Sequence, residues 1–342
     1  MSASPPDHTP THRQRVLMLG ATGTAGRATV QALVGAGHDV IGLVRPGAPD
    51  EDSDERRRRV ALRPEVELRS VDVTDPESWA RDAIRGERFD ALVSCLASRT
   101  GVPADAWAID HRAHSLALAA AKDAGVAHMV LLSAICVQRP KLAFQHAKLA
   151  FERELIDSGL SWSIVRPTAF FKSLSGQVKR VQNGDPFLLF GNGTRTACKP
   201  ISDEDLGDYI AGCLSYPARI DRILPIGGPG PAITPREQGE RLFALTGHKP
   251  RFQRVPLAMF TVASAVLGPL GRISSSCARK AELARIGHYY ATESMLVLDP
   301  ETGRYDADAT PSTGTQTLFD FYARLLDGSA TIARGEHAVF DK

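Results

Sequence analysis

One stretch decides the fold: Val16-Leu17-Met18-Leu19-Gly20-Ala21-Thr22-Gly23-Thr24-Ala25-Gly26. Its apolar run predicts a buried parallel strand, and the glycines stand where that strand would turn into a helix. Gly20 permits the tight turn, Gly23 lets the backbone approach a pyrophosphate, and Gly26 lets the helix pack closely on the sheet. With Thr22 and Thr24, these glycines predict a dinucleotide-binding loop whose helix N-terminus faces the phosphates.

Apolar runs and helical segments then alternate along the first half of the chain. The expected strands are 16–19, 40–44, 66–71, 89–95, 128–133 and 161–165, and the expected helices are 25–36, 107–124 and 144–158. Strands that alternate with helices predict a parallel sheet with helices on both faces. Right-handed crossovers make this a doubly wound α/β sheet of the Rossmann type.

The order of segments predicts two unequal lobes after a disordered start. Residues 1–13 are expected to be disordered, and residues 14–170 to form the dinucleotide-binding domain, with short returns to it around 198–228. Beyond Arg166, glycine and proline become frequent. Residues 171–342 are therefore expected to form mainly a smaller, irregular substrate-binding lobe.

Two segments allow more than one interpretation. Residues 46–59 are acidic first and then rich in arginine, and we expect a solvated loop, with a phosphate-binding patch as the alternative. Residues 255–271 are the longest uncharged stretch, but prolines and glycines leave it short of a membrane-spanning helix. We expect a buried or half-buried helix there. The alternative is a surface that touches lipid or a large apolar ligand.

Composition narrows the class of protein. The chain has 342 residues, with 41 Lys and Arg against 39 Asp and Glu, and its net charge of +2 argues against a dedicated nucleic-acid-binding protein. Its five cysteines include no Cys-x-x-Cys pair, so neither a disulfide framework nor a metal held by the protein is expected. The first residues lack the apolar core of a secretory signal, and a cytoplasmic location is expected.

The residue at the end of the second expected strand selects the nucleotide. NAD-binding proteins usually carry Asp or Glu there, whereas this chain has Arg45. A guanidinium matches the 2′-phosphate of NADP(H), so NADPH is the expected cofactor, with a solvated strand-end arginine as the alternative. Asp72 and Ser94 follow the third and fourth strands and are expected to complete the pocket at the carboxyl edge of the sheet.

Glycine spacing and strand order resemble the atypical branch of the short-chain dehydrogenase/reductases. Typical members of the superfamily carry a serine after the fifth strand and a Tyr-x-x-x-Lys pair on the next helix. Here Ser133 and Lys148 stand at those places and are expected to bind the cofactor, but Phe144 replaces the tyrosine. A phenyl ring cannot donate a proton, so the usual carbonyl chemistry is in doubt. Gln145 shares the Lys148 side of the helix and is expected to orient the substrate, whereas His146 points largely the other way.

Longer stretches carry a more specific resemblance. They include Val93-Ser94-Cys95-Leu96-Ala97-Ser98-Arg99, Phe144-Gln145-His146-Ala147-Lys148, Ile164-Val165-Arg166-Pro167-Thr168-Ala169-Phe170-Phe171-Lys172 and Tyr289-Tyr290-Ala291-Thr292-Glu293-Ser294-Met295. Over residues 15–326 the chain resembles the NADPH-dependent 8-vinyl-reductases of divinyl chlorophyllide and protochlorophyllide, in the NmrA-like branch. Phe-Gln-x-x-Lys is part of the pattern of that family.

The resemblance implies reduction of the 8-vinyl group of 3,8-divinyl (proto)chlorophyllide a to ethyl by NADPH, in (bacterio)chlorophyll biosynthesis. The substrate would be a magnesium tetrapyrrole, whose metal belongs to the substrate. Plant members begin with a transit peptide, and the start of this chain departs from them. A bacterial phototroph is therefore expected, with the protein cytoplasmic or peripheral at photosynthetic membranes.

This chemistry would explain the missing tyrosine. The macrocycle can delocalise the charge left when hydride adds at the vinyl terminus, so no alkoxide forms. The proton would come from water or from Lys148 or Lys172, which are the expected catalytic residues. The residues expected around the reacting groups are Pro167 and Phe170 beside the nicotinamide and Phe171 and Tyr290 against the macrocycle.

Three other functions stay open at this point. An NmrA-like regulator would bind NADP(H) without turnover. A different reductase of the same branch would act on another conjugated double bond. A structural subunit of a membrane complex would co-purify with its partners.

Overall fold

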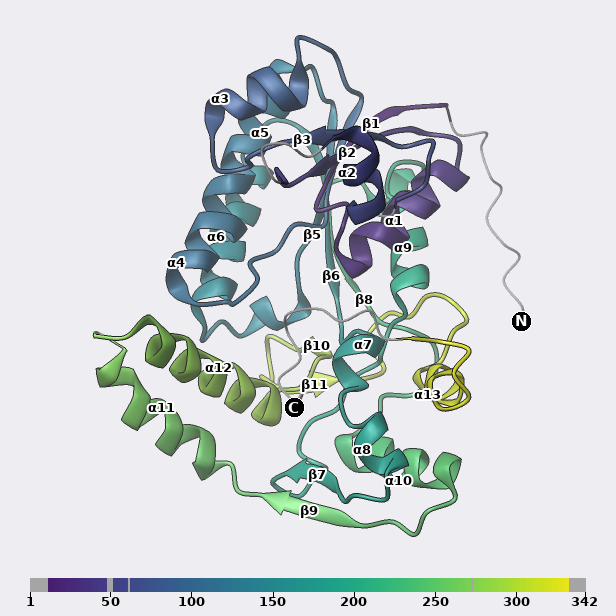
Figure 1. Ribbon diagram of the computed structural model, residues 1–342, viewed down its shortest axis with the longest axis vertical. Coiled ribbons are helices and arrows are strands. Elements are labelled where there is room, and N and C mark those ends of the chain that lie inside the picture. The colour runs from purple at the N-terminus through teal and green to yellow at the C-terminus, as the bar shows by residue number, and fades with distance from the viewer. Residues whose placement is uncertain (1–11, 48–51, 61, 272, 332–342) are drawn as a thin grey trace.

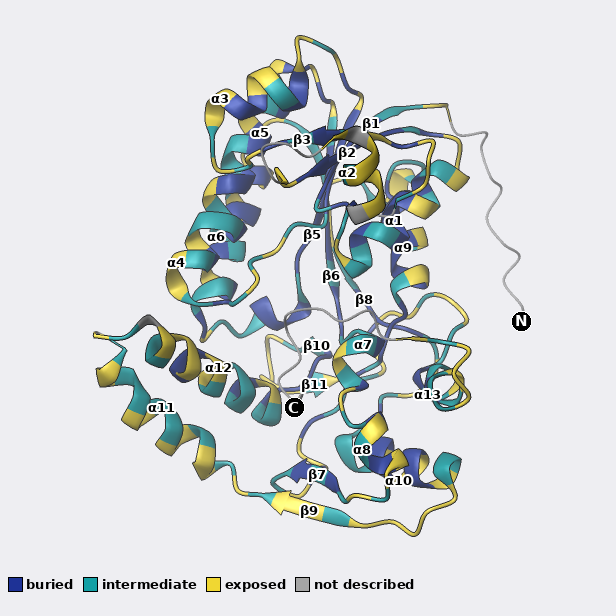
Figure 2. Ribbon diagram, in the orientation of Figure 1, coloured by how far each residue is buried: buried dark blue, intermediate teal, exposed yellow. Residues whose placement is uncertain are grey.

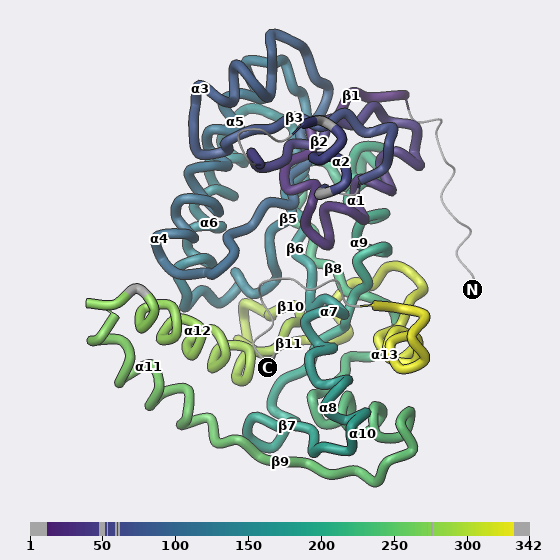
Figure 3. The backbone as a smooth tube through the Cα atoms, viewed as in Figure 1, coloured from purple at the N-terminus to yellow at the C-terminus, as the bar shows by residue number. Residues whose placement is uncertain are grey.

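The structure is a computed structural model that describes residues 12–47, 52–60, 62–271 and 273–331. Residues 1–11, most of the segment expected to be disordered, lie outside the described residues, as do residues 48–51 of the expected charged loop. The backbone trace separates an upper lobe, made mostly of the first half of the chain, from a lower lobe of later residues (Figure 3).

Seven strands of the described chain form one sheet in the order β3-β2-β1-β4-β5-β6-β8. All neighbouring pairs are parallel. The predicted doubly wound α/β fold is thus confirmed. The strands are β1 (Arg15–Leu19), β2 (Asp39–Val44), β3 (Glu67–Ser70), β4 (Ala91–Ser94), β5 (His128–Leu132), β6 (Ser161–Pro167) and β8 (Arg222–Ile226).

Helices cover both faces of this sheet (Figure 1). The helices on one face bury Val30 and Leu206 against the strands, and those on the other bury Trp79 and Phe151. The strands are therefore enclosed by two apolar layers, which is why their sequences read as short continuous apolar runs. The covering elements are α1 (Thr24–Gly35) and α9 (Asp203–Gly212) on the first face, and the π-helical η1 (Trp79–Ile84), α5 (His114–Asp123) and α6 (Ala143–Ile156) on the second.

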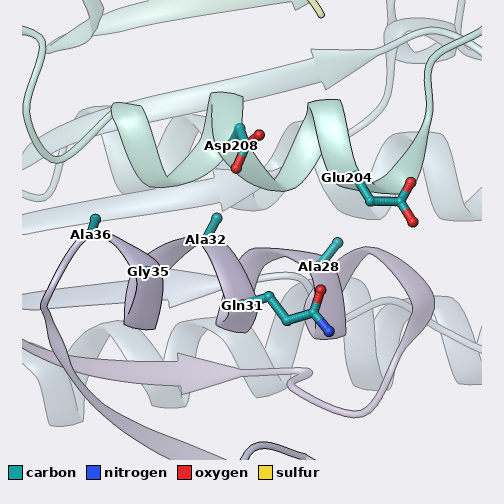
Figure 4. A pocket seen from close by; sticks show the side chains of 7 residues that line it. All are labelled: Ala28, Gln31, Ala32, Gly35, Ala36, Glu204 and Asp208. Carbon is teal, nitrogen blue, oxygen red and sulfur yellow. The ribbon is translucent and has the colours of Figure 1, made fainter. Parts of the chain in front are cut away.

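The contact between α1 and α9 depends on a glycine. A Cβ at Gly207 of α9 would lie 2.6 Å from the carbonyl carbon of Ala28, so the two helix backbones touch. Figure 4 shows Ala28 and Ala32 pointing from α1 towards α9, with Glu204 and Asp208 on the opposite side of the hollow between the two helices. Burial and the neighbouring carboxylates raise the pKa of Asp208. Alanine and glycine thus let a late helix return to the first lobe.

A third core fills the lower lobe. Phe243 and Tyr322 are fully buried in it, and the Tyr322 hydroxyl donates to the Leu174 carbonyl at 2.7 Å. The lobe comprises α7 (Phe171–Leu174), α8 (Val178–Gln182), β7 (Phe187–Phe190), α10 (Pro235–Thr246), β9 (Phe252–Val255), β10 (Val297–Leu298), β11 (Tyr305–Asp306) and α13 (Leu318–Leu326). Shorter helical segments elsewhere are α3 (Pro76–Ser78), α4 (Pro103–Ala106), η2 (Trp107–Ala113), η3 (Ile135–Gln138) and η4 (Pro217–Arg219).

The expected solvated loop at 46–59 is wrong in its second half, which forms helix α2 (Ser53–Val60). The reason is a reciprocal cap at its start. The Asp52 carboxylate accepts from the Glu55 N–H at 2.7 Å, and the Glu55 carboxylate accepts from the Asp52 N–H at 3.3 Å. This arrangement satisfies two backbone donors that would otherwise oppose helix formation.

The long uncharged stretch forms helix α11 (Ala258–Leu270), which pairs with α12 (Ser275–Thr292) in a hairpin that extends from the lower lobe (Figure 1). The expectation was a buried or half-buried helix, and the structure has the half-buried form, because the residues of α11 are of intermediate exposure or exposed and none is buried (Figure 2). Its inner side packs against α12, where a Cβ at Gly287 would lie 2.6 Å from the ring of Phe260. Its outer side has no covering element among the described residues.

The glycine contact between α1 and α9 generates a stability prediction. Gly207→Ala should lower the free energy of unfolding by about 1–3 kcal/mol, because the new methyl would overlap the α1 backbone. Gly35→Ala is the matched control, since nothing lies within 4 Å of its Cβ position. That change should be neutral or stabilise by up to about 1 kcal/mol. Urea unfolding measures both, and equal effects at the two positions would contradict the packing described.

Candidate functional site

The glycine loop is held by backbone contacts. Gly20 has φ +78°, and a Cβ there would lie 2.6 Å from the carbonyl carbon of Cys95, just after β4. A Cβ at Gly26 would lie 2.0 Å from the Gly20 carbonyl oxygen. Gly26 therefore lets the helix approach the backbone of the glycine loop at Gly20, whereas the prediction was an approach to the sheet. The loop can take this shape only because both positions are glycine.

The start of α1 has the features of an anion-binding site. Gly23 is the N-cap, and no acidic residue lies in the first turn. Lys172 Nζ donates to Thr24 Oγ1 at 3.3 Å, which brings a positive charge to the same place. Free N–H groups, the helix dipole and an ammonium together favour a phosphate. Burial raises the pKa of nearby Asp203 to about 6, against the opposing charge of Lys172.

This geometry changes the interpretation of Lys172. The sequence predicts it as a source of the proton, yet its ammonium lies beside the first turn of α1. A cation there is better placed to bind phosphate than to protonate a macrocycle. Thr24, which is predicted to bind the cofactor, is thus joined at this place by Lys172 of α7.

A second part of the site lies beyond the end of β2. One pocket is lined by Thr22 of the glycine loop, by Arg45 and by Arg99. Its remaining lining residues are Pro46, Gly47 and Val60. Two guanidinium groups at the carboxyl edge of a parallel sheet form a pocket suited to an anion. Sequence reasoning missed Arg99, although its position just after β4 was a usable signal.

Asp72 and Ser94 are engaged locally. Asp72 Oδ1 accepts from the N–H and the hydroxyl of Thr74 at 2.9 and 2.7 Å, and these bonds lower the pKa of its carboxyl. Ser94 is fully buried, and its hydroxyl lies 2.9 Å from His114 Nε2. Burial, and then the charge of Lys148, lowers the pKa of His114 to about 4. Its Nδ1 lies 2.8 Å from the Ile109 carbonyl oxygen, which can only accept, so in the neutral ring Nε2 accepts from the Ser94 hydroxyl. Because the Ser94 hydroxyl is bonded to His114, a cofactor would contact the backbone near Ser94 rather than its side chain.

Lys148 on α6 is fixed by a buried carboxylate. Its Nζ lies 3.0 Å from Asp110 Oδ1, and the side chains are 11% and 0% exposed. The Ser98 N–H donates to the same oxygen at 3.2 Å, which ties the segment after β4 to the pair. Asp110 Oδ2 is buried without a hydrogen-bond partner among the described residues, so Lys148 supplies the main compensation for this charge. Sequence reasoning missed Asp110, because no motif marks it.

Ser133 forms a hydrogen bond with Glu152 and takes no part in the Lys148–Asp110 ion pair. Its hydroxyl donates to Glu152 Oε1 at 2.5 Å, and Glu152 also pairs with Arg166 of β6, whose Nε lies 3.2 Å from the same oxygen. Glu152 is 2% exposed, so this network is buried. Ser133 therefore acts in this structure as a link between the end of β5 and α6. Its predicted contact with the cofactor stays a prediction.

Two residues predicted to contact the substrate are enclosed by other parts of the protein. Gln145 is fully buried, and its amide bonds to the backbone of Lys141, Leu142 and Cys136, so it caps the start of α6, and its predicted role towards the substrate stays a prediction. Phe171 is 2% exposed and packs in the lower core, with its ring 5.6 Å from that of Phe321. The backbone at the start of α6 binds the Gln145 amide, and the side chains of the lower core surround the Phe171 ring.

The remaining aromatic candidates lie nearer the surface. Tyr290 is 45% exposed, and Phe144 and Phe170 are half-buried. At Gly101, after β4, a Cβ would lie 3.1 Å from Ile286 of α12 and 3.7 Å from the ring of Phe144. The α12 helix of the hairpin thus places the apolar side chain of Ile286 near Phe144 at the start of α6. Pro167 is buried at the end of β6, and His146 is exposed, as its helical position predicted.

These features define a class of protein. A parallel sheet with a glycine-rich turn after β1, an anion-binding helix start and a basic pocket beyond β2 is typical of nicotinamide dinucleotide binding. Residues 20–217 match the NAD(P)H-binding family, so the chain belongs to it. An NADPH-dependent quinone oxidoreductase of Escherichia coli, solved with NADPH, superposes with a TM-score of 0.65 at 18% identity, covering 91% of this chain and 99% of that one. This likeness shows the fold.

Curated relatives narrow the family. The chain is 47% identical over 331 residues to the chloroplastic divinyl chlorophyllide a 8-vinyl-reductase of Oryza sativa subsp. indica, covering 95% of this chain and 82% of that protein. It is 46% identical to the protein of the same name from Cucumis sativus, covering 95% and 79%. This chain belongs to the divinyl chlorophyllide a 8-vinyl-reductase family, as the sequence resemblance predicted.

The basic pocket generates a binding prediction. Arg45→Ala should weaken NADPH binding by about 10- to 100-fold and leave NADH binding nearly unchanged, because only NADPH carries the 2′-phosphate that a guanidinium would hold. Fluorescence titration of each nucleotide measures this. Arg81→Ala, which removes an exposed arginine of η1 paired with Asp82, is the matched control. Equal losses for both nucleotides in Arg45→Ala would contradict a phosphate role.

Proposed function

We propose that this chain uses NADPH to reduce the 8-vinyl group of 3,8-divinyl chlorophyllide a to ethyl, as a step of (bacterio)chlorophyll biosynthesis. The observation that carries the proposal is the 47% identity to a protein of that name across 95% of the chain. The site supports it, because a lysine is kept where a reductase would need it while the tyrosine position holds Phe144. Protochlorophyllide is the alternative form of the same substrate.

The residues of the glycine loop fit the cofactor. Gly20 and Gly26 hold the loop in its tight turn, and the first turn of α1 together with Lys172 would hold the pyrophosphate. Arg45 and Arg99, on one pocket with Thr22, would hold the adenosine 2′-phosphate. When bound, NADPH supplies the hydride of the reduction. Each of these residues binds and orients.

In this proposal Lys148 binds the nicotinamide ribose and donates the proton. Asp110 fixes its ammonium at 3.0 Å, and the side chain is only 11% exposed, so few waters compete with it. An ammonium held in this way can bind a ribose hydroxyl and can donate a proton, directly or through water. Asp110 contacts no reacting atom in this scheme and serves as a positioning residue.

The substrate explains why no phenol is needed. Reduction of a vinyl group adds one hydride and one proton to two carbons, and the conjugated macrocycle can spread the negative charge that hydride addition leaves. Without an alkoxide, the site has no need of a tyrosine acid. The apolar side chains of Phe144 and Ile286, which meet beside Gly101, would suit a flat macrocycle.

The test is an anaerobic assay of the full chain with 3,8-divinyl chlorophyllide a and NADPH. Chromatography and mass measurement should find a product with two added hydrogens at the 8-position, formed only with NADPH. Demonstrated NADPH binding without any product would contradict the proposal and favour a regulator that senses the nucleotide.

Variants of the active-site helix test the assigned roles. Lys148→Met should lower kcat by at least about 100-fold, because it removes the ammonium that orients and protonates. Lys148→Arg keeps the positive charge for Asp110 and is the control for folding. Phe144→Tyr should give no gain in rate. A clear gain in Phe144→Tyr, or full turnover in Lys148→Met, would contradict the mechanism.

A further inference from the structure

The outer side of α11 carries a row of exposed apolar side chains. Met259, Val262, Val266 and Leu270 are 50%, 60%, 59% and 48% exposed, and Ile273 beyond the helix is 89% exposed. The spacing of the first four, three or four residues apart, places them on one face of the helix. We call these five residues the apolar stripe. Monomeric proteins rarely leave such a continuous apolar surface in water without a use for it.

Charge is distributed unevenly around the stripe. The thirteen residues of α11 include no charged side chain. The early turns of α12, which follow directly, carry Arg279 and Lys280, and both are exposed. The next acidic residue, Glu282, is 4% exposed and pairs with Arg285 at 3.0 Å. The free end of the hairpin therefore combines exposed apolar groups with exposed positive charge.

The hairpin extends to one side of the molecule: α11 leads out from β9, and α12 leads back towards β10 (Figure 1). The Tyr289 hydroxyl donates to the Cys136 carbonyl at 2.8 Å and anchors the end of α12 beside α6. Within the described residues, no helix has the length and apolarity needed to cross a membrane. A hairpin of this kind suits contact with the surface of a bilayer rather than passage through it.

We propose that the apolar stripe and the cations Arg279 and Lys280 form a docking surface for an anionic lipid bilayer. Apolar side chains enter the boundary between headgroups and acyl chains, and the two cations bind acidic headgroups. Charge complementarity selects lipid over other apolar partners. The biological role of this surface rests on the proposed reductase function, which would bring the protein to photosynthetic membranes. Its binding to lipid can be tested without that function.

The test is co-flotation of the full chain with vesicles, without NADPH or tetrapyrrole, so the result is independent of reductase activity. The chain should bind vesicles of phosphatidylcholine with phosphatidylglycerol, and bind phosphatidylcholine alone far more weakly. Val262→Ser with Val266→Ser should weaken binding by at least about tenfold. Arg279→Glu with Lys280→Glu should weaken it by a similar factor, and added salt should do the same to the unmodified chain.

The matched control changes two exposed apolar residues that lie outside the hairpin. Ile156→Ser with Ile223→Ser removes apolar side chains that are 39% and 41% exposed on the other lobe, and should leave vesicle binding unchanged. Circular dichroism and gel filtration verify folding of each variant. No binding of the unmodified chain to anionic vesicles, or undiminished binding of the stripe variant, would overturn the proposal. So would a dimer of the unmodified chain that the stripe variant dissociates, because the stripe would then join two copies.

Discussion

No side-chain atom fits at Gly20 or Gly26, and this steric limit shapes the whole upper lobe. A Cβ at either position would lie between 2.0 and 2.6 Å from backbone atoms of the loop or of the segment after β4. The close approach pins β1, β4 and the start of α1 together at the carboxyl edge of the sheet. Since the helix then begins on bare N–H groups, the same constraint that holds the fold also makes the anion site.

Two buried ion pairs fix the position of α6 relative to the sheet. Asp110 holds Lys148, and Glu152 holds Arg166 while accepting from Ser133. Both carboxylates are at most 2% exposed, so loss of either cation would leave a buried charge, at a cost of about 3–5 kcal/mol. Such pairs add little net stability. What they provide is a fixed position for α6 and for the ammonium it presents.

The sequence predicted what depends on local pattern. The apolar runs, the glycine spacing and Arg45 identified the sheet, its loop and the pocket, because periodicity and turn chemistry act within a few residues. The burial of Gln145 and Phe171 was not predicted, because a helix face does not reveal whether a helix cap or a core takes the side chain. Gly207 and Asp110 act on residues far along the chain. Asp52 and Glu55 did carry a local capping signal, which the charge of the segment obscured.

The central claim is that hydride passes to the vinyl terminus and the macrocycle, rather than a phenol, accommodates the resulting charge. Turnover with NADPH that carries deuterium at both positions of the nicotinamide C4, in ordinary water, tests this most directly. Mass spectrometry and proton NMR of the product should find one deuterium in the terminal methyl of the new ethyl group, with the second hydrogen taken from solvent. Deuterium on the carbon next to the ring, or none in the ethyl group, would contradict the account.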